Sequence, residues 1–188
     1  TSGPGIAMTM DDEGSARRAT EHLIALGHSR IGFIAGPKEY DLSNWRIDGW
    51  REAMTSTGLS CDALCVRGDV GYDSGVLAAN ALLDLQDPPT AIIGSNDQMT
   101  LAALDAAKAR GFHIPGDLSL ISFDNTPVVR FTVPELTAVD QPIAATFSKA
   151  VELLITNGDA LVPHQPVVIE GSLIERSSTA PPSAHGRA

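Results

Sequence analysis

The chain has 188 residues, of which 43% are hydrophobic, and it carries a net charge of −10 from 13 Lys and Arg against 23 Asp and Glu. This length and composition fit one well-cored globular domain and part of a second. The acidic balance offers no basic patch for phosphates, so we expect these residues not to bind nucleic acid by themselves. We find no apolar run of about 20 residues and no signal peptide, so the sequence predicts no membrane contact and a cytoplasmic location.

The cysteine and histidine content points away from a metal or disulfide scaffold. Cys61 and Cys65 are the only cysteines, and the five histidines are scattered without ligand spacing. We expect two free thiols, no metal site and no cofactor.

Helical patterns alternate with short apolar runs between residues 14 and 123. The apolar runs are nearly uninterrupted, which suits strands covered on both faces, and the helical crossovers between them require parallel strands. The sequence therefore predicts an α/β fold with a parallel, doubly wound sheet. The predicted elements are helices at 14–26, 44–57, 72–86 and 97–110, and strands at 31–36, 64–68, 90–95 and 118–123.

Residues of capping type lie at the ends of these predicted helices. Asp11 or Asp12 can cap the first helix, and Gly27, Gly58 and Gly111 follow helices that need a left-handed residue to end. The caps agree with the boundaries that the apolar pattern predicts.

The repeating pattern breaks after Asp124. Residues 125–135 hold two prolines and no helical period, so we expect a boundary there, and residues 134–142 are interpreted as an extended linker. A helix is predicted at 143–157 and a final strand pair at 166–176. One helix and one or two strands cannot build a core alone, so most of this second lobe lies outside the chain.

Polar residues follow the predicted strands at one common edge. Asn96 and Asp97 follow the strand at 90–95, Asp124 follows the strand at 118–123, and ligands of open parallel sheets bind at this carboxyl edge. Arg46 begins the helix after another strand, and Gln141 lies in the connection to the second lobe. Together Arg46, Asn96, Asp124 and Gln141 offer donors and acceptors for a polyhydroxylated or amide-bearing small molecule. We place three further residues next to the ligand: Trp50, Asp97 and Phe123.

Each of these residues also has a structural interpretation. Asn96 or Asp97 alternatively caps the helix that follows, and Asp124 alternatively forms an Asx turn with its neighbour. Arg46 is alternatively a solvated helix residue, and Trp50 a packing residue. The sequence alone leaves these alternatives open.

The sequence contains none of the common catalytic motifs. It lacks G-x-S-x-G, H-E-x-x-H, the P-loop and a G-x-G-x-x-G after a strand, and no nucleophile or metal set accompanies Asp97 and Asp124. We expect a protein that is not an enzyme.

Six segments in register closely resemble the effector-binding core of the lactose-repressor (LacI) family of bacterial transcription regulators. The resemblance covers about residues 10–180. The segments are ALGHSRIGFIAGP (25–37), RIDGW (46–50), PTAIIGSNDQM (89–99), GFHIPGDLSLISFDN (111–125), PELTAVDQP (134–142) and IERSSTAPP (174–182).

The resemblance implies a two-lobed core like that of periplasmic sugar-binding proteins, with the effector between the lobes. It assigns residues 11–140 to a nearly complete C-terminal lobe and residues 141–172 to a remnant helix and strand of an N-terminal lobe that is mostly missing. Residues 1–10 are then an incomplete strand or linker, and residues 173–188 a return strand and disordered tail.

The resemblance also implies the function and the ligand contacts. The family's effector contacts on this lobe fall on Arg46, Asn96, Asp124 and Gln141. The implied protein senses a small-molecule effector, expected to be a carbohydrate, and binds operator DNA only through a headpiece outside these 188 residues. Val70 stands where the lactose repressor carries a tryptophan after the Gly-Asp pair, which removes an aromatic face for a sugar ring.

Family members dimerise through the C-terminal lobe, so we expect a homodimer. Met99, Ala102, Ala103 and Ala106 form a small-residue helix face that serves either this interface or packing on the sheet of the same lobe. The alternative function is a solute-binding protein of a sugar transporter, which shares the two-lobed fold.

Overall fold

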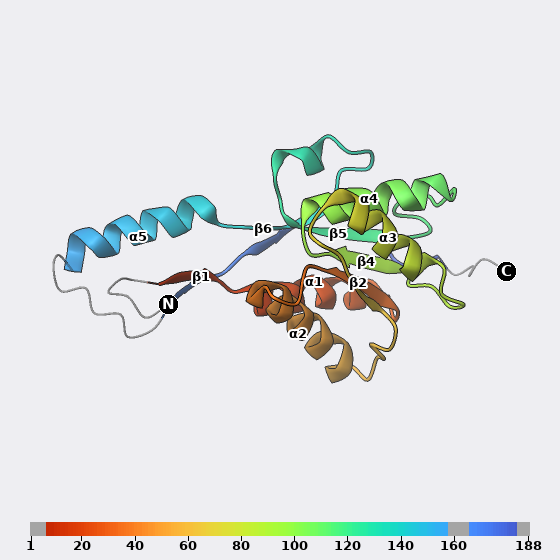
Figure 1. Cartoon of the computed structure of the whole chain (residues 1–188), viewed down its shortest axis with the longest axis horizontal. Coiled ribbons are helices and arrows are strands. Elements are labelled where there is room, and N and C mark those ends of the chain that lie inside the picture. The colour runs from red at the N-terminus through yellow and green to blue at the C-terminus, as the bar shows by residue number, and fades with distance from the viewer. Residues whose placement is uncertain (1–6, 158–165, 184–188) are drawn as a thin grey trace.

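The computed structural model describes residues 7–157 and 166–183. Strands and helices alternate along most of this length, as the sequence predicts (Figure 1). In chain order the elements are β1 (Met8–Met10), α1 (Asp12–Ala25), β2 (Ile31–Ala35), α2 (Asp41–Ser56), β3 (Cys65–Arg67), α3 (Tyr72–Leu83), β4 (Ala91–Gly94), α4 (Asp97–Ala109), β5 (Ser119–Asp124), the 3-10 helix η1 (Pro127–Arg130), β6 (Thr137–Asp140), α5 (Ile143–Asn157), β7 (Val167–Ile169) and β8 (Ser172–Ile174).

The described strands form a six-stranded sheet of order β3-β2-β4-β5-β6-β8 and a two-stranded sheet of β1 and β7. In the larger sheet β8 runs antiparallel to β6, and the other neighbours are parallel. The predicted α/β class and parallel, doubly wound sheet are confirmed.

Two helix pairs cover the two faces of the large sheet. Ile34 of β2 and Ile92 of β4 belong to the apolar cluster of α3 and α4. Phe33 and Ile93, their neighbours in sequence, belong to the cluster of α1 and α2. Successive strand side chains point to opposite faces, so strands covered on both sides need an unbroken apolar run.

Helix ends follow the predicted capping residues. Asp11 Oδ1 accepts a hydrogen bond of 2.9 Å from the Gly14 amide at the start of α1. Gly27, Gly58 and Gly111 have φ values of +99°, +76° and +76° just beyond α1, α2 and α4. Glycine adopts this left-handed conformation without steric cost, which fixes where these helices end.

The predictions for residues after Asp124 need correction. The predicted extended linker at 134–142 contains β6, whose first three residues are buried beside β5, so these residues form a strand of the large sheet. The strands at 166–176 do not pair with each other, because β7 pairs with β1 and β8 pairs with β6. β6 pairs in parallel with β5 and antiparallel with the remote β8, and this pairing makes its four residues a strand rather than a linker.

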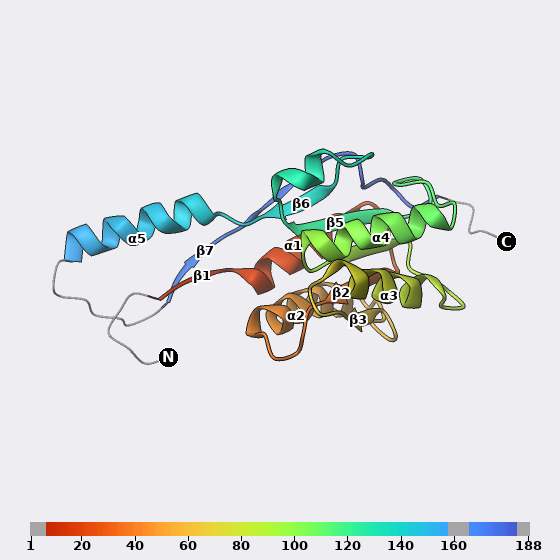
Figure 2. The same cartoon turned by 45° about the horizontal axis from the view of Figure 1, so that its top comes forward.

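β1, β7 and α5 lie to one side of the six-stranded sheet (Figures 1 and 2). The apolar side chains of α5 are exposed there, with Phe147 at 69% and Ile155 at 78%. The division into two lobes and its exact boundaries stay predictions.

The segment after β8 packs against the sheet. The Leu120 amide donates to the Ser178 carbonyl at 2.8 Å, and the Thr137 amide donates to Ser178 Oγ at 2.8 Å. His28, whose pKa is lowered by burial, contacts the Ala180 carbonyl through Nε2 at 2.9 Å. The expectation of a disordered tail is therefore wrong for residues 175–183. Residues 1–6 and 184–188 lie outside the described part of the chain.

Candidate functional site

The carboxyl ends of five adjacent strands form one edge of the large sheet. Because β3, β2, β4, β5 and β6 are parallel neighbours, the residues that follow them lie in the same order across this edge. In that order they include Val70, Gly36, Ser95, Asp124 at the end of β5, and Gln141. Open parallel sheets bind their ligands at this edge.

Arg46 lies across the middle of this edge. Its side chain, from α2, is 3% exposed, and Nε donates to Asp12 Oδ1 at 2.6 Å. Nη1 donates to the Ser95 carbonyl and lies 3.9 Å from Asp124 Oδ1. The guanidinium carbon lies 4.4 Å from the centroid of the Phe123 ring. Two carboxylates and an aromatic face thus hold a buried cation in a fixed orientation.

Asp124 stays partly exposed, unlike the buried Asp12 and Arg46. Its side chain is 30% exposed, and Oδ1 accepts a hydrogen bond of 2.6 Å from Gln141 Nε2. Burial raises the pKa of Asp124 and outweighs the opposing effect of Arg46, while the charges of Asp97 and Asp12 raise it further. The backbone of Asp124 has a φ of +90°, which is uncommon for a residue with a side chain. A strained, partly desolvated carboxyl beside a cation is typical of a functional position.

Gly49 explains how Asp12 reaches Arg46. A Cβ at Gly49 would lie 2.0 Å from the Glu13 carbonyl oxygen, so only glycine lets α2 approach the start of α1 this closely. The sequence showed Asp12 only as an alternative helix cap, and Asp11 holds that position. The ion pair with Arg46 was missed because it depends on the packing of two helices.

Asn96 has the structural role that the sequence left open. Its Oδ1 accepts from the Met99 amide at 2.9 Å and caps α4. Its Nδ2 donates to the Val70 carbonyl at 2.8 Å and so joins the loops after β3 and β4. Both the oxygen and the nitrogen of the Asn96 amide are therefore engaged in hydrogen bonds within the fold. A ligand contact by Asn96 stays a prediction.

The three residues predicted to lie next to the ligand have different environments in the structure. Asp97 is buried, with Oδ1 accepting from Ser122 Oγ at 2.6 Å and Oδ2 from the Thr126 amide at 2.8 Å, so it braces the loop after β5. Phe123 lies beneath Arg46 and is fully buried. For Trp50 the placement is wrong. Its indole donates to the carbonyl of Ile31, at the amino end of β2, so Trp50 packs at the opposite end of the strand.

The four residues considered for a dimer interface belong to the core of this lobe. A Cβ at Gly75 of α3 would lie 2.8 Å from Ala102 Cβ, which shows how closely α3 and α4 pack. Burial of this face within the chain supports the packing alternative. The exposures are 0% for Met99, Ala102 and Ala103 and 7% for Ala106.

A cavity of about 190 Å³ opens beside the Arg46 cluster, where β1 leads into α1. Asp12 forms part of its wall, so the cavity adjoins the ion pair with Arg46. Trp45, whose side chain is 43% exposed, gives it an aromatic face. The remaining lining residues are Thr9, Met10, Asp11, Glu13 and Val168.

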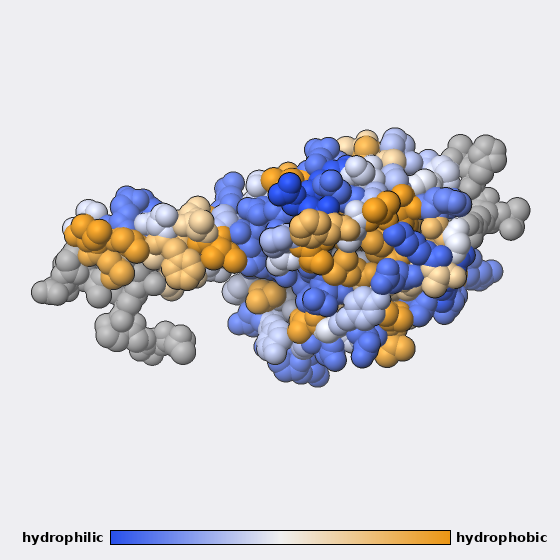
Figure 3. Space-filling view, turned by 90° about the horizontal axis from the view of Figure 1, so that it is seen from above, coloured by the Kyte–Doolittle hydropathy of each residue, from blue (hydrophilic) through white to orange (hydrophobic). Residues whose placement is uncertain are grey.

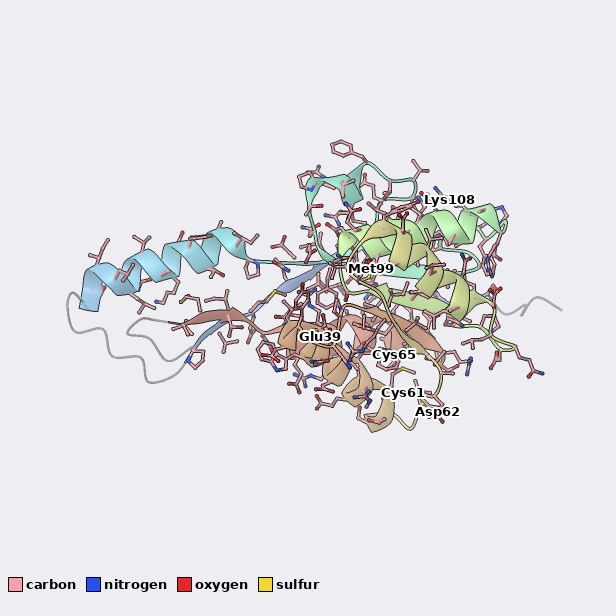
Figure 4. The ribbon with its side chains drawn as sticks, viewed as in Figure 1. Glu39, Cys61, Asp62, Cys65, Met99 and Lys108 are labelled. Atoms are coloured by element: carbon pink, nitrogen blue, oxygen red, sulfur yellow. The ribbon has the colours of Figure 1, made fainter. Side chains whose placement is uncertain are left out.

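Other reactive residues lie away from this edge. Cys61 and Cys65 are free thiols at the α2–β3 connection and in β3, and burial raises the pKa of each (Figure 4). Within residues 7–157 and 166–183, no group of three or more His, Cys, Asp or Glu is arranged to hold a metal ion. In the same residues, no helix is long and apolar enough to cross a membrane.

Comparison with known proteins identifies the family. Residues 20–179 match the model of the periplasmic binding protein-like domain. The chain is 40% identical over 147 residues to the HTH-type transcriptional repressor CytR of Escherichia coli K12, covering 78% of this chain and 43% of that protein. The chain thus spans less than half the length of this relative.

Solved structures agree with this assignment. A regulatory protein of the LacI family from Chloroflexus aggregans superposes with a TM-score of 0.87 at 35% identity, covering 95% of this chain and 65% of that one. The transcriptional regulator CelR in complex with cellobiose superposes with a TM-score of 0.85 at 33% identity, covering 93% and 54%. The chain belongs to the LacI family and corresponds to part of its effector-binding domain. Its relatives are transcriptional regulators, not enzymes.

Proposed function

We propose that this chain is the effector-sensing part of a transcriptional regulator and that it binds a polyhydroxylated small molecule, most simply a carbohydrate. The observation that carries the proposal is the cluster of Arg46, Asp124 and Gln141 at the carboxyl edge of the sheet. A guanidinium, a carboxylate and an amide supply the directional donors and acceptors that neighbouring hydroxyl groups require. The cellobiose bound by the similar regulator CelR supports a sugar as effector.

In the longer protein, ligand binding between two lobes would change the affinity for operator DNA. An effector shifts this equilibrium only if it binds one lobe arrangement more tightly than the other, typically by about 1–3 kcal/mol of coupling. With a net charge of −10, the chain itself is poorly suited to contact DNA, so we assign operator binding to a separate headpiece. The names of the relatives favour this function over transport. A cytoplasmic location follows from the proposal and stays a prediction.

We also propose that the protein acts as a homodimer. Phe131 and Val133, next to η1, are 82% and 78% exposed. Apolar side chains gather on the upper face of the molecule around this loop (Figure 3). Such a patch supports self-association through the larger lobe.

Isothermal titration tests the effector site. The chain would be titrated with cellobiose, other glucosides, galactosides, pentoses, polyols and purines. Saturable binding that Asp124→Ala weakens by about tenfold or more is expected, because a hydrogen bond to a charged group contributes about 1.5–3 kcal/mol. Asp62→Ala is the matched control, since Asp62 lies on the loop that enters the amino end of β3 (Figure 4). A ligand bound equally well by Asp124→Ala and the parent would overturn the assignment.

A further inference from the structure

Ser43 carries a buried hydroxyl that the fold leaves unbonded. The residue lies in the first turn of α2 and is 1% exposed, and its Oγ has no hydrogen-bond partner within the described residues. Buried polar atoms in native proteins are nearly always paired, because an unpaired one loses its hydration without compensation. Ser43 precedes Arg46 by three residues and so lies on the same face of α2, one turn away. The unbonded hydroxyl therefore adjoins the candidate effector site.

The surroundings of Ser43 place it on the carboxyl edge of the sheet. A Cβ added to Gly36 would lie 2.6 Å from Ser43 Oγ and 3.2 Å from Val70 Cγ1, so the three residues meet at one point. Gly36 follows β2 and Val70 follows β3, which is the parallel neighbour of β2. Arg67 holds this point in place by donating from Nη1 to the Gly36 carbonyl at 2.9 Å. The edge therefore continues beyond Arg46 to the close contact between Gly36 and Ser43.

Val70 lies beside this contact in a strained conformation. Its φ is +72°, which a β-branched residue adopts only at a steric cost. Two hydrogen bonds maintain this backbone conformation. Asn96 Nδ2 donates to the Val70 carbonyl at 2.8 Å, and the Gly71 amide donates to Asp69 Oδ1 at 2.8 Å. The Val70 side chain is 38% exposed, whereas Ser43 beside it is 1% exposed.

We propose that Ser43 is an additional effector-binding residue and that Val70 covers its hydroxyl in the ligand-free chain. An effector displaces the Val70 side chain, bonds Ser43 through a hydroxyl or amide group, and rests an aliphatic C–H face on Val70. This rests on the proposed function, and it restricts the effector to molecules with a second polar group beyond the one bound by Arg46 and Asp124. Gly36 has to stay glycine, because any side chain there would fill the space.

Thiol labelling tests the cover without an effector. Ser43→Cys is placed in a chain with Cys61→Ser and Cys65→Ser, and its reaction with methyl methanethiosulfonate is followed with and without Val70→Gly. We expect Val70→Gly to speed labelling by about tenfold, because glycine relieves the positive φ and uncovers position 43. Ser178→Cys in the same background, at a buried site in the segment after β8, is expected to show no such change. Equal labelling rates at position 43 with and without the Val70→Gly substitution would overturn the cover.

Thermal melting tests whether the Ser43 hydroxyl is structural. Ser43→Ala removes an unpaired buried hydroxyl, so we expect an unchanged or raised Tm. Ser178→Ala removes a hydroxyl that donates to the Leu120 carbonyl at 2.6 Å, and we expect its Tm to fall by several degrees. A similar fall for Ser43→Ala would show that Ser43 is bonded within the fold and would overturn the proposal.

Titration then tests the contact itself. A panel sugar such as cellobiose that binds the parent should bind Ser43→Ala about tenfold more weakly, while Ser178→Ala, if folded at the assay temperature, should bind normally. Equal binding by Ser43→Ala and the parent would overturn the proposal, although the site at Asp124 would stand if Asp124→Ala still weakened binding. Silence of the parent across the panel would count against the proposed function. The labelling and melting results would still decide whether Val70 covers an unbonded Ser43.

Discussion

The Asp12 carboxylate and the Arg46 guanidinium form a buried ion pair of 2.6 Å between the starts of two helices, across 34 residues of sequence. Both side chains are nearly inaccessible, at 7% and 3% exposure. Arg46 in turn lies on the Phe123 ring and reaches towards Asp124. The geometry of the candidate effector site is therefore set by the packing of α1 on α2 as well as by the strand ends.

Asp12→Asn should destabilise the protein strongly. The amide keeps the shape but removes the charge, and breaking a buried ion pair on one side typically costs about 3–5 kcal/mol. Urea denaturation measures the loss in unfolding free energy. Glu52→Gln is the control, because its partner Arg17 is 4.0 Å away and both side chains are largely exposed, so a loss below about 1 kcal/mol is expected. Equal small losses in both variants would show that the buried pair contributes little.

Gly49→Ala should separate the two helices. The new Cβ would lie 2.0 Å from the Glu13 carbonyl oxygen, which belongs to the backbone and cannot rotate away. We expect a loss of about 1–3 kcal/mol, or more if α1 cannot shift, together with weaker effector binding as Arg46 loses Asp12. Circular dichroism melts measure the first effect and titration the second.

Gly116→Ala is the control for this test. A Cβ at Gly116 would come no closer than 3.8 Å to any neighbour, so its stability should change by less than about 0.5 kcal/mol. If Gly49→Ala changed the stability as little as Gly116→Ala, the close approach of α1 and α2 would not be what positions Asp12.

The raised pKa of Asp124 predicts a specific pH dependence of stability. Burial disfavours the ionised carboxylate in the folded chain, so the folded state binds the proton more tightly than the unfolded state, where the pKa is about 3.9. The stabilising contribution of Asp124 is therefore fully present below about pH 4 and is lost as the pH rises through the raised value. Asp124→Asn should unfold at higher denaturant concentration than the parent at about pH 7, and this advantage should shrink below about pH 4. A variant that is less stable than the parent at neutral pH would contradict the assigned cause.

The same substitution should weaken effector binding. Asp124→Asn replaces a charged acceptor with a neutral amide, so a protein that gains stability would lose affinity at the same position. Residues kept for function rather than for the fold commonly show this trade-off. A titration at neutral pH beside the denaturation series measures both properties in one preparation.

The elements that the sequence predicted well are those with a local signal. Uninterrupted apolar runs such as 31–35 indicate buried parallel strands, and parallel strands place Asp124 and the residues before Gln141 at one edge. Gln141 was included in the candidate site only as part of the connection to the second lobe, and its contact with Asp124 depends on the pairing of β6 with β5. β6 was read as a linker, and its pairing with β8 joins segments far apart in sequence.

The predictions that failed at the site concern which way a side chain points and which part of the protein covers it. Trp50 lies in the same motif as Arg46, yet its side chain reaches the amino end of β2. Met99 and Ala103 of α4 show a small apolar stripe, and such a stripe is the same whether a sheet or a second subunit covers it. Only the packed structure distinguishes these cases.

The exposed face of α5 predicts that the chain associates with itself. Its apolar side chains are half to three-quarters exposed. Soluble monomeric proteins rarely expose a contiguous apolar patch of this kind. They are Ile143, Phe147, Val151, Leu154 and Ile155. Light scattering after size exclusion, over a range of protein concentrations, should show species larger than a monomer.

The double variant Phe147→Lys with Val151→Lys tests whether this face drives the association. It should shift the chain towards the monomer, because charged side chains on the stripe oppose its burial against a second copy. Phe147 is 69% and Val151 52% exposed, so the unfolding free energy should change by no more than about 0.5 kcal/mol for each substitution. Lys149→Ala, on the same helix but outside the stripe, should leave the association unchanged. A parent that is a monodisperse monomer at every concentration would count against association through α5 and equally against the proposed homodimer.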